Sequence, residues 1–228
     1  MNILDLVFPK ECLGCGKEGS YLCKSCQETF LKASPICPFC QKPSLGGKTH
    51  SFCREKCDLE GLFSFFRFEG LLKEVIHQIK YEFLTDIFPE LFSVIFREWE
   101  NEKAFISLYK FIDQKKPILV PIPLHWHKEN IRGFNQSVLF GKALAKKTGL
   151  SLKEDTLIKR KPTVSQTTLG SKERKENVRG IFKLKKPVRG LSIVLVDDVW
   201  TTGATMTEAA GVLKKAGAKN IWGLTICR

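Results

Sequence analysis

The chain has 228 residues, which is enough for one or two domains, and 43% of them are hydrophobic and 27% charged. This composition is typical of a globular protein and excludes a collagen-like, coiled-coil or disordered chain. No apolar run approaches the roughly 18 residues that a transmembrane helix needs, and no basic segment precedes the apolar N-terminal residues. We therefore expect a soluble, cytoplasmic protein with no secretory signal and no membrane insertion.

The positive charge is concentrated in one part of the chain. The formal net charge is +13, and residues 142–190 contain 15 basic and 4 acidic side chains. Lysine and arginine bind phosphate groups without requiring a particular fold, so a basic excess of this size favours an anionic partner. A phosphate-rich small molecule and a nucleic-acid backbone both fit this expectation.

Residues 1–60 are predicted to form a small module that metal stabilises. They hold eight of the nine cysteines, in four pairs; two residues separate the members of the first three pairs and three residues those of the last. In a reducing compartment such pairs favour metal binding over disulfides, and two pairs complete the tetrahedral shell of a zinc ion. We expect two structural zinc sites with no open coordination position. Their predicted ligands are Cys12, Cys15, Cys23, Cys26, Cys37, Cys40, Cys53 and Cys57.

The spacing leaves the pairing of these ligands open. Sequential pairing, the first pair with the second and the third with the fourth, is the simpler interpretation, and a cross-braced arrangement also fits. His50 lies three residues before Cys53. We expect His50 to be a solvated loop residue, with replacement of one thiolate as the alternative. The ninth cysteine, Cys227, ends a predicted strand and is expected to be a small buried hydrophobic residue.

After residue 60, predicted strands alternate with predicted helices, as the spacing of apolar residues indicates. The strand at 191–198 is apolar on both faces, which is typical of a parallel sheet covered by helices. The sequence therefore predicts an α/β domain with a central parallel sheet. Residues 101–116 are polar and ambiguous. The other predicted strands are 62–68, 118–123 and 221–227, and the predicted helices are 71–83, Pro89 to about Trp99, 134–148 and about 205–216.

Residues 194–206, VLVDDVWTTGATM, carry the most specific motif. A hydrophobic strand ends in Asp197 and Asp198, and a turn rich in threonine and glycine then opens a helix. A helix N-terminus offers amide donors and a positive dipole end, so this turn is predicted to cradle a phosphate group. The spacing is neither that of a P-loop nor that of a GxGxxG turn. The two carboxylates are suited to accept hydrogen bonds from neighbouring hydroxyls of a sugar.

This segment resembles the ribose-phosphate signature of type I phosphoribosyltransferases, which bind 5-phosphoribosyl-1-diphosphate (PRPP) together with Mg²⁺. The resemblance implies that Asp197 and Asp198 contact the ribose hydroxyls. The residues that it implies for the 5-phosphate are Thr201, Thr202, Gly203, Ala204 and Thr205.

The whole chain resembles the ComF competence-protein family, which joins an amino-terminal double zinc ribbon to a phosphoribosyltransferase-like domain. The segments FRFEGLLKEVIHQIKY (66–81), VPIPLHWHKENIRGFNQS (120–137) and SQTTLGSKERKENVRGIF (165–182) carry this resemblance together with the cysteine pairs. It implies a double zinc ribbon over residues 1–60 and a type I phosphoribosyltransferase fold over residues 61–228.

Further site residues follow from the same resemblance. Residues 61–90 are implied to hold hood elements around the acceptor, and the basic segment 159–178 is implied to be a flexible loop or hairpin that closes over the substrate. The implied diphosphate contacts are Pro121, Ile122, Pro123, Lys128 and Arg132, and the implied loop contacts are Lys159, Arg160, Lys161, Arg174 and Arg179.

Two functions therefore fit the sequence. The first is a transferase that uses PRPP and Mg²⁺ with an unidentified acceptor and acts in natural competence. The alternative is a non-catalytic accessory protein of the DNA-uptake machinery, which binds single-stranded DNA through residues 142–190 and has a helicase as a further partner. Phe134 and Trp200 are candidates for stacking on bases, although we expect aromatic residues at such junctions to belong to the core.

Overall fold

A computed structural model describes residues 9–101, 105–161 and 178–228. The chain forms two compact units, a smaller one from Met1–Ala33 with Phe65–Glu102 and a larger one from Ser34–Ser64 with Lys103–Arg228. Among the described residues, each unit contains one group of clustered metal-ligating side chains. The expected boundary at residue 60 stays a prediction about which segments fold on their own.

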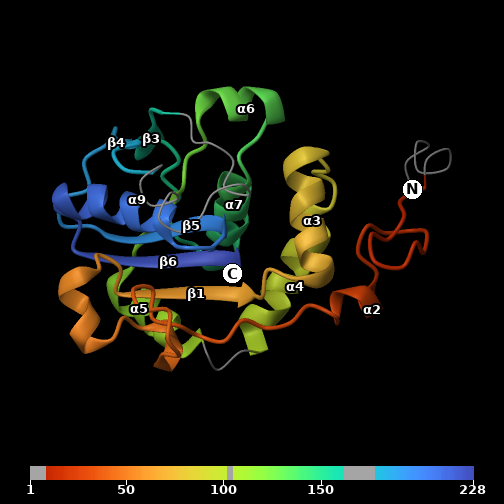
Figure 1. The fold of residues 1–228 in the computed structure, drawn as a ribbon, viewed down its shortest axis with the longest axis horizontal. Helices are drawn as coiled ribbons and strands as arrows, with labels where there is room; N and C mark the ends of the chain where they lie inside the picture. Colours follow the sequence, from red (N-terminus) through yellow and green to blue (C-terminus); the bar gives the residue numbers. More distant parts are fainter. Residues whose placement is uncertain (1–8, 102–104, 162–177) are drawn as a thin grey trace. The chain divides into compact units, whose positions relative to one another are not determined.

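A four-stranded sheet forms the centre of the larger unit, with the strand order β1-β6-β5-β2 (Figure 1). Strand β5 pairs in parallel with both β2 and β6. The expected α/β class with a central parallel sheet is therefore confirmed. Val194, Leu195 and Val196 are buried because β5 lies inside the sheet with both faces covered. The strands are β1 (Gly61–Phe66), β2 (Ile118–Pro121), β5 (Ser192–Val199) and β6 (Asn220–Cys227).

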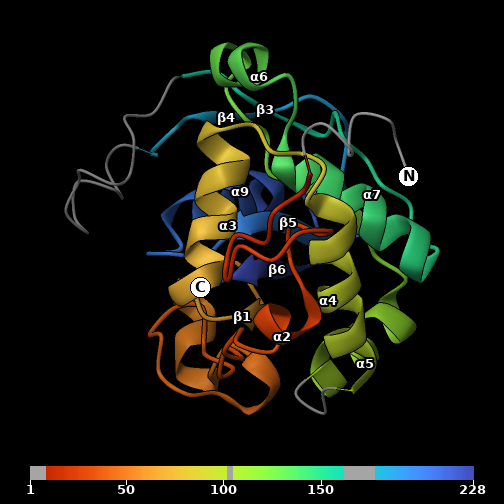
Figure 2. The same ribbon diagram turned by 90° about the vertical axis from the view of Figure 1, so that its right-hand side faces the viewer.

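Helices cover both faces of this sheet. Figure 2 looks onto the carboxyl ends of β1 and β6, with α9 (Ala204–Lys215) on one face and α7 (Gln136–Thr148) and α5 (Ile106–Lys115) on the other. Helix α7 packs against β2 and β5. Full burial of each aliphatic side chain contributes roughly 1.5–3 kcal/mol to stability. The core under α9 includes Met206, Ala209 and Leu213 of the helix and Ile193, Leu195 and Ile221 of the strands.

Shorter elements surround the sheet in the larger unit. Strands β3 (Leu157–Lys159) and β4 (Phe182–Leu184) form an antiparallel pair at the two ends of the expected loop. Residues 162–177, which include Arg174, lie outside the described residues. The remaining elements are α6 (Trp126–Arg132) and the 3₁₀ helices η1 (Leu45–Gly47) and η2 (Ser51–Lys56).

The smaller unit packs two amphipathic helices with the first cysteine-rich segment. Helix α3 (Gly70–Tyr81) buries Leu72, Val75, Ile76 and Ile79, at the helical spacing seen in the sequence. In α4 (Phe88–Asn101), Glu90 accepts hydrogen bonds from the backbone amides of Tyr21 and Leu22. The Glu90 carboxylate therefore attaches the segment between Cys15 and Cys23, two predicted zinc ligands, to helix α4. The short helix α2 (Lys24–Gln27) follows Cys23.

The strand predicted at 62–68 is present as β1, and its six residues are all buried, as a covered strand requires. Two helices were not predicted from the sequence. The ambiguous region contains α5, and α6 was not expected at all. Within the described ranges, no helix is both long enough and apolar enough to cross a membrane.

Candidate active site and metal centres

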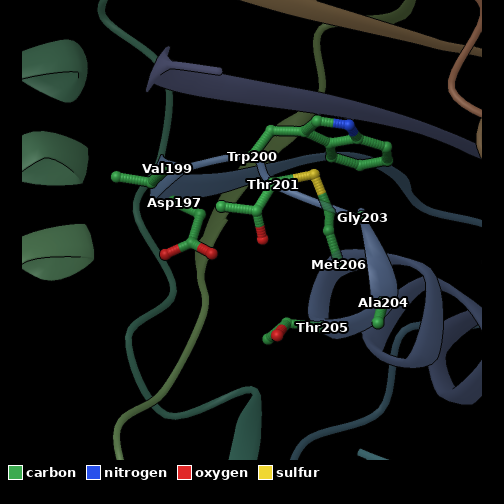
Figure 3. A pocket seen from close by; sticks show the side chains of 8 residues that line it. All are labelled: Asp197, Val199, Trp200, Thr201, Gly203, Ala204, Thr205 and Met206. Carbon is green, nitrogen blue, oxygen red and sulfur yellow. The ribbon is translucent and has the colours of Figure 1, made fainter. Parts of the chain in front are cut away.

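The phosphate motif surrounds a hollow at the carboxyl end of β5 (Figure 3). The carboxylate of Asp197 and the hydroxyl of Thr201 lie on one side of the strand, and the indole of Trp200 lies on the other side. A carboxylate and a hydroxyl beside the backbone amides at the start of α9 are suited to bind a ligand that is rich in oxygen atoms. The residues that line the hollow are Asp197, Val199, Trp200, Thr201, Gly203, Ala204, Thr205 and Met206.

Asp197 is held in place by two hydrogen bonds to one of its oxygens. Ser137 Oγ donates to Asp197 Oδ1 at 2.8 Å, and the backbone amide of Asp198 donates to the same atom at 3.0 Å. The other implied ribose contact, Asp198, is buried and does not line the hollow. Successive side chains of a strand point to opposite faces, which explains why the two carboxylates do not share one environment.

The loop after β5 depends on one glycine. Gly203 has a φ of +76°, and a Cβ atom at this position would overlap the ring of Trp200. The adjacent amide of Ala204 donates to Thr202 Oγ1 at 3.4 Å. Trp200 itself is only 4% exposed, so it belongs to the core and is not available for stacking on a base. Among the predicted phosphate contacts, only the Thr202 side chain does not line the hollow.

The turn after β2 is tied to the same site by Asn135, which the sequence analysis did not single out. Asn135 Nδ2 donates to the carbonyl of Ile122 at 3.1 Å, and its Oδ1 accepts from the amide of Ser137 at 2.9 Å. Asn135 thereby joins the implied diphosphate turn to the start of α7, where Ser137 holds Asp197. The RGFNQS segment carried the signal, because asparagine is a preferred N-cap residue.

The implied diphosphate contacts have different environments. The side chain of Ile122 is buried in the hydrophobic core, so only its backbone is available to a ligand. Pro121 ends β2, Pro123 is half-buried, and Lys128 and Arg132 are half-buried on α6. Exposed Arg179 lies shortly before β4.

Lys159 of β3 adds a cation close to Asp197. Burial and, to a smaller extent, the positive charge of Lys128 lower the pKa of Lys159 to about 8, against the opposing effect of the Asp197 carboxylate. Side chains from β3, α6 and β5 therefore interact electrostatically at one place. A cationic pair beside a carboxylate is the arrangement that a ligand with both phosphate and hydroxyl groups would use.

The first metal-ligating group lies in the smaller unit and agrees with the expected sequential pairing. The sulfur atoms of Cys12, Cys15, Cys23 and Cys26 lie within 4.8 Å of one another. Four thiolates at this spacing fit a structural zinc ion. Hydrogen bonds, the largest from the Ser25 hydroxyl, lower the pKa of Cys23 to about 6.

The second group, in the larger unit, differs from the predicted ligand set at one position. Cys37, Cys40 and Cys53 are joined by His50, and Cys57 is not part of the group. His50 Nδ1 lies 3.3 Å from Cys40 Sγ. Cys57 instead packs against the hydrophobic core, and burial raises its pKa. Three cysteines and one histidine form a common zinc-binding set, so this group also fits a structural ion.

Comparisons with known proteins agree with this arrangement. The double zinc ribbon domain model matches residues 3–58, and the phosphoribosyl transferase domain model matches residues 135–228. DNA utilization protein YhgH of Salmonella typhimurium is 29% identical, over 91% of this chain and 90% of that protein. Competence protein ComFC of Bacillus subtilis is 27% identical, over 93% of this chain and 86% of that protein. The chain therefore contains a double zinc ribbon and a phosphoribosyl transferase domain, and over most of its length it is similar to a competence protein and to a DNA utilization protein.

The segments that the family models match contain most of the site. Asn135, Ser137 and Asp197 lie inside the phosphoribosyl transferase match, whereas the turn at Pro121 and the lysine at 128 precede it. Competence protein F of Haemophilus influenzae is 32% identical over 46% of this chain and 48% of that protein. A purine phosphoribosyltransferase from Pyrococcus horikoshii covers 57% of this chain and 84% of that structure, at 18% identity and a TM-score of 0.33. A likeness of this size says nothing about what the chain binds.

Proposed function

We propose that the chain binds PRPP together with Mg²⁺ at the carboxyl end of β5. The observation that carries this proposal is the hollow in which Asp197 lies beside Thr201 and Thr205. In the proposed complex, the loop from Thr201 to Thr205 holds the 5-phosphate at the start of α9, where a helix favours anions. The carboxylate of Asp197, fixed by Ser137, accepts hydrogen bonds from the ribose hydroxyls.

The proposed chemistry is transfer of the phosphoribosyl group. When diphosphate leaves the anomeric carbon, positive charge develops on the sugar ring and negative charge on the leaving group. Lys128 and Lys159 would stabilise the departing diphosphate, and the Asp197 carboxylate would favour the positive charge on the ring. Bound Mg²⁺ would supply additional charge neutralisation at the diphosphate.

Thermal unfolding tests the proposed ligand. A ligand that binds only the folded chain stabilises it by about 2.7 kcal/mol at a concentration of 100 times Kd, so PRPP with MgCl₂ should raise Tm. Without ligand, the variant with Asp197→Asn and Asp198→Asn should have a Tm close to that of the parent. With PRPP and MgCl₂ it should lose most of the increase in Tm. Lys24→Gln, an exposed change in α2, serves as the matched control and should shift like the parent. An unchanged parent Tm across millimolar PRPP would contradict the assignment.

A second function, binding of single-stranded DNA as part of DNA uptake or utilisation, rests on a different observation. Basic side chains outnumber acidic ones by 15 to 4 in residues 142–190. The names of the similar proteins, competence protein ComFC and DNA utilization protein YhgH, support a role connected with DNA. Binding of PRPP and binding of DNA are compatible, since the charge extends along the chain well beyond the hollow. Helicase binding and a cytoplasmic location belong to the same proposal.

A further inference from the structure

The two metal-ligating groups are built on the same backbone turn. In each, the residue after the second cysteine donates its amide to the carbonyl of the first cysteine. The N···O distance is 2.8 Å from Gly16 to Cys12 and 2.9 Å from Gln41 to Cys37. The two turns can therefore be compared position by position.

The comparison shows one unusual residue. Gly16 has a φ of +72° and Gln41 a φ of +58°, so both adopt the left-handed conformation. Glycine adopts it without steric penalty, whereas a residue with a Cβ atom does so at some loss of stability. The second turn thus carries a glutamine where the first carries the residue that the backbone favours. A non-glycine residue in this conformation is often retained for what its side chain does.

The Gln41 side chain reaches the proposed phosphate loop. Gln41 Nε2 donates a hydrogen bond to the backbone carbonyl of Thr202 at 3.4 Å, across 161 positions of sequence within the larger unit. Thr202 lies between Thr201 and Gly203, both of which line the hollow. Glycine at position 41 would have no side chain with which to make this contact.

The turn that carries Gln41 is itself fastened to the central sheet. The amide of Thr49 donates to the carbonyl of Glu60 at 2.8 Å, and the amide of Glu60 donates to the carbonyl of Ile221 in β6 at the same distance. At the other end of the segment, Arg228 donates to the carbonyl of Ser34 at 2.7 Å. The segment Ser34–Ser64, which carries the second metal-ligating group and is called the second metal module below, therefore provides a fixed support from which the Gln41 side chain can hold the loop.

We propose that Gln41 is a positioning residue that holds the Thr202 backbone, so that the second metal module supports the phosphate loop from outside the hollow. This inference rests on the proposed function for its effect on PRPP binding. Its effect on the loop itself does not depend on the ligand. A metal ion held by Cys37 and Cys40 would order the turn that carries Gln41.

Two substitutions separate support of the loop from support of the fold. Gln41→Gly removes the side chain and also relieves the left-handed conformation, so zinc content and Tm should stay level or rise. Gln41→Met keeps the length of the side chain and replaces its amide with a thioether, so the donor is lost. A neutral hydrogen bond contributes about a factor of two to ten, and both variants should bind PRPP that much more weakly. Gln27→Ala is the matched control, because Gln27 Nε2 donates to Leu22 within the first metal module.

Hydrogen exchange of the backbone amides at 200–205 gives a readout without ligand. Both Gln41 variants should exchange faster there than the parent or Gln27→Ala, at unchanged zinc content. Parental exchange rates in both variants, or parental PRPP affinity where the parent binds, would overturn the inference. Faster exchange in a chain whose parent does not bind PRPP would uphold the role of Gln41 in holding the loop and refute the proposed function alone.

Discussion

Lys159 is the residue at which burial and charge most clearly affect the candidate site. It is half-buried, and the nearby Lys128 repels it, so the neutral form is favoured compared with an ordinary lysine. The carboxylate of Asp197 offsets only part of this effect. A bound diphosphate would stabilise the protonated form, which means that ligand binding and protonation of Lys159 are linked.

We predict that PRPP binding weakens as the pH rises through about 8, where Lys159 loses its proton. Phosphate monoesters complete their ionisation near pH 6, so the ligand contributes little to a change between pH 7 and 9. Calorimetry should give a several-fold larger Kd at pH 9 than at pH 7.

Replacement of Lys159 checks the assignment of this pH dependence. Lys159→Arg should bind with nearly equal affinity at both pH values, because arginine stays protonated. Lys183→Arg, an exposed change in β4, should keep the dependence of the parent. The same profile in the parent and in Lys159→Arg would assign the effect to another group.

At the scale of elements, the metal modules show what spacing alone predicts and what it does not. Spacing favoured the sequential grouping as the simpler interpretation, because cysteines two residues apart bring their sulfurs to one ion. It also favoured Cys57 over His50 as the fourth donor of the second group, because Cys57 continues the series of cysteine pairs. In the structure Cys57 is partly buried against the core, while the His50 ring is turned toward Cys40.

Zinc content distinguishes the two candidate donors. We predict that His50→Ala lowers the metal content from about two zinc ions per chain toward one, because three thiolates leave the second shell incomplete. Cys57→Ser should keep both ions and lose only a modest amount of stability. His50→Cys should restore binding by supplying a thiolate, and it serves as the control for simple loss of the ring. Loss of one zinc ion in Cys57→Ser with full content in His50→Ala would reverse the assignment.

The helices and strands could be predicted because the apolar residues that stabilise them by burial also mark them in the sequence. Leu72, Val75, Ile76 and Ile79 mark α3 by helical spacing, and β5 is a continuous apolar run. Helix α6 was missed because it has only seven residues and no buried side chain, so no apolar periodicity marks it. The link from Asn135 to Ile122 was also beyond sequence patterns, because it joins two turns 13 positions apart.

At the scale of the whole molecule, the basic charge is distributed more widely than one small ligand requires. Twelve of the 15 basic residues in 142–190 lie in described parts of the chain, and all of these except Lys159 are exposed. PRPP carries about five negative charges, on one phosphate and one diphosphate. Exposed pairs such as Lys142 with Glu154 contribute little to stability. This distribution is the physical argument for a longer anionic partner.

We predict that the parent binds an unstructured oligonucleotide of single-stranded DNA with an affinity that falls steeply with salt. Each phosphate contact contributes about 0.7 to the slope of log affinity against log salt, so loss of three contacts should lower it by about 2. The test variant combines Lys183→Gln, Lys185→Gln and Arg189→Gln, three exposed positions in or after β4.

The control for this measurement removes the same charge elsewhere. Lys17→Gln, Lys24→Gln and Lys73→Gln are exposed positions of the smaller unit and should leave the slope close to that of the parent. The double replacement of Asp197 and Asp198 by asparagine should preserve DNA binding or strengthen it, because it removes negative charge while abolishing the PRPP response. Equal salt slopes for the test variant and this control variant would mean that the excess charge of residues 142–190 does not contact the DNA. Absence of binding by the parent at low salt would refute the proposed DNA partner, and the basic residues would then serve only as a solvated surface.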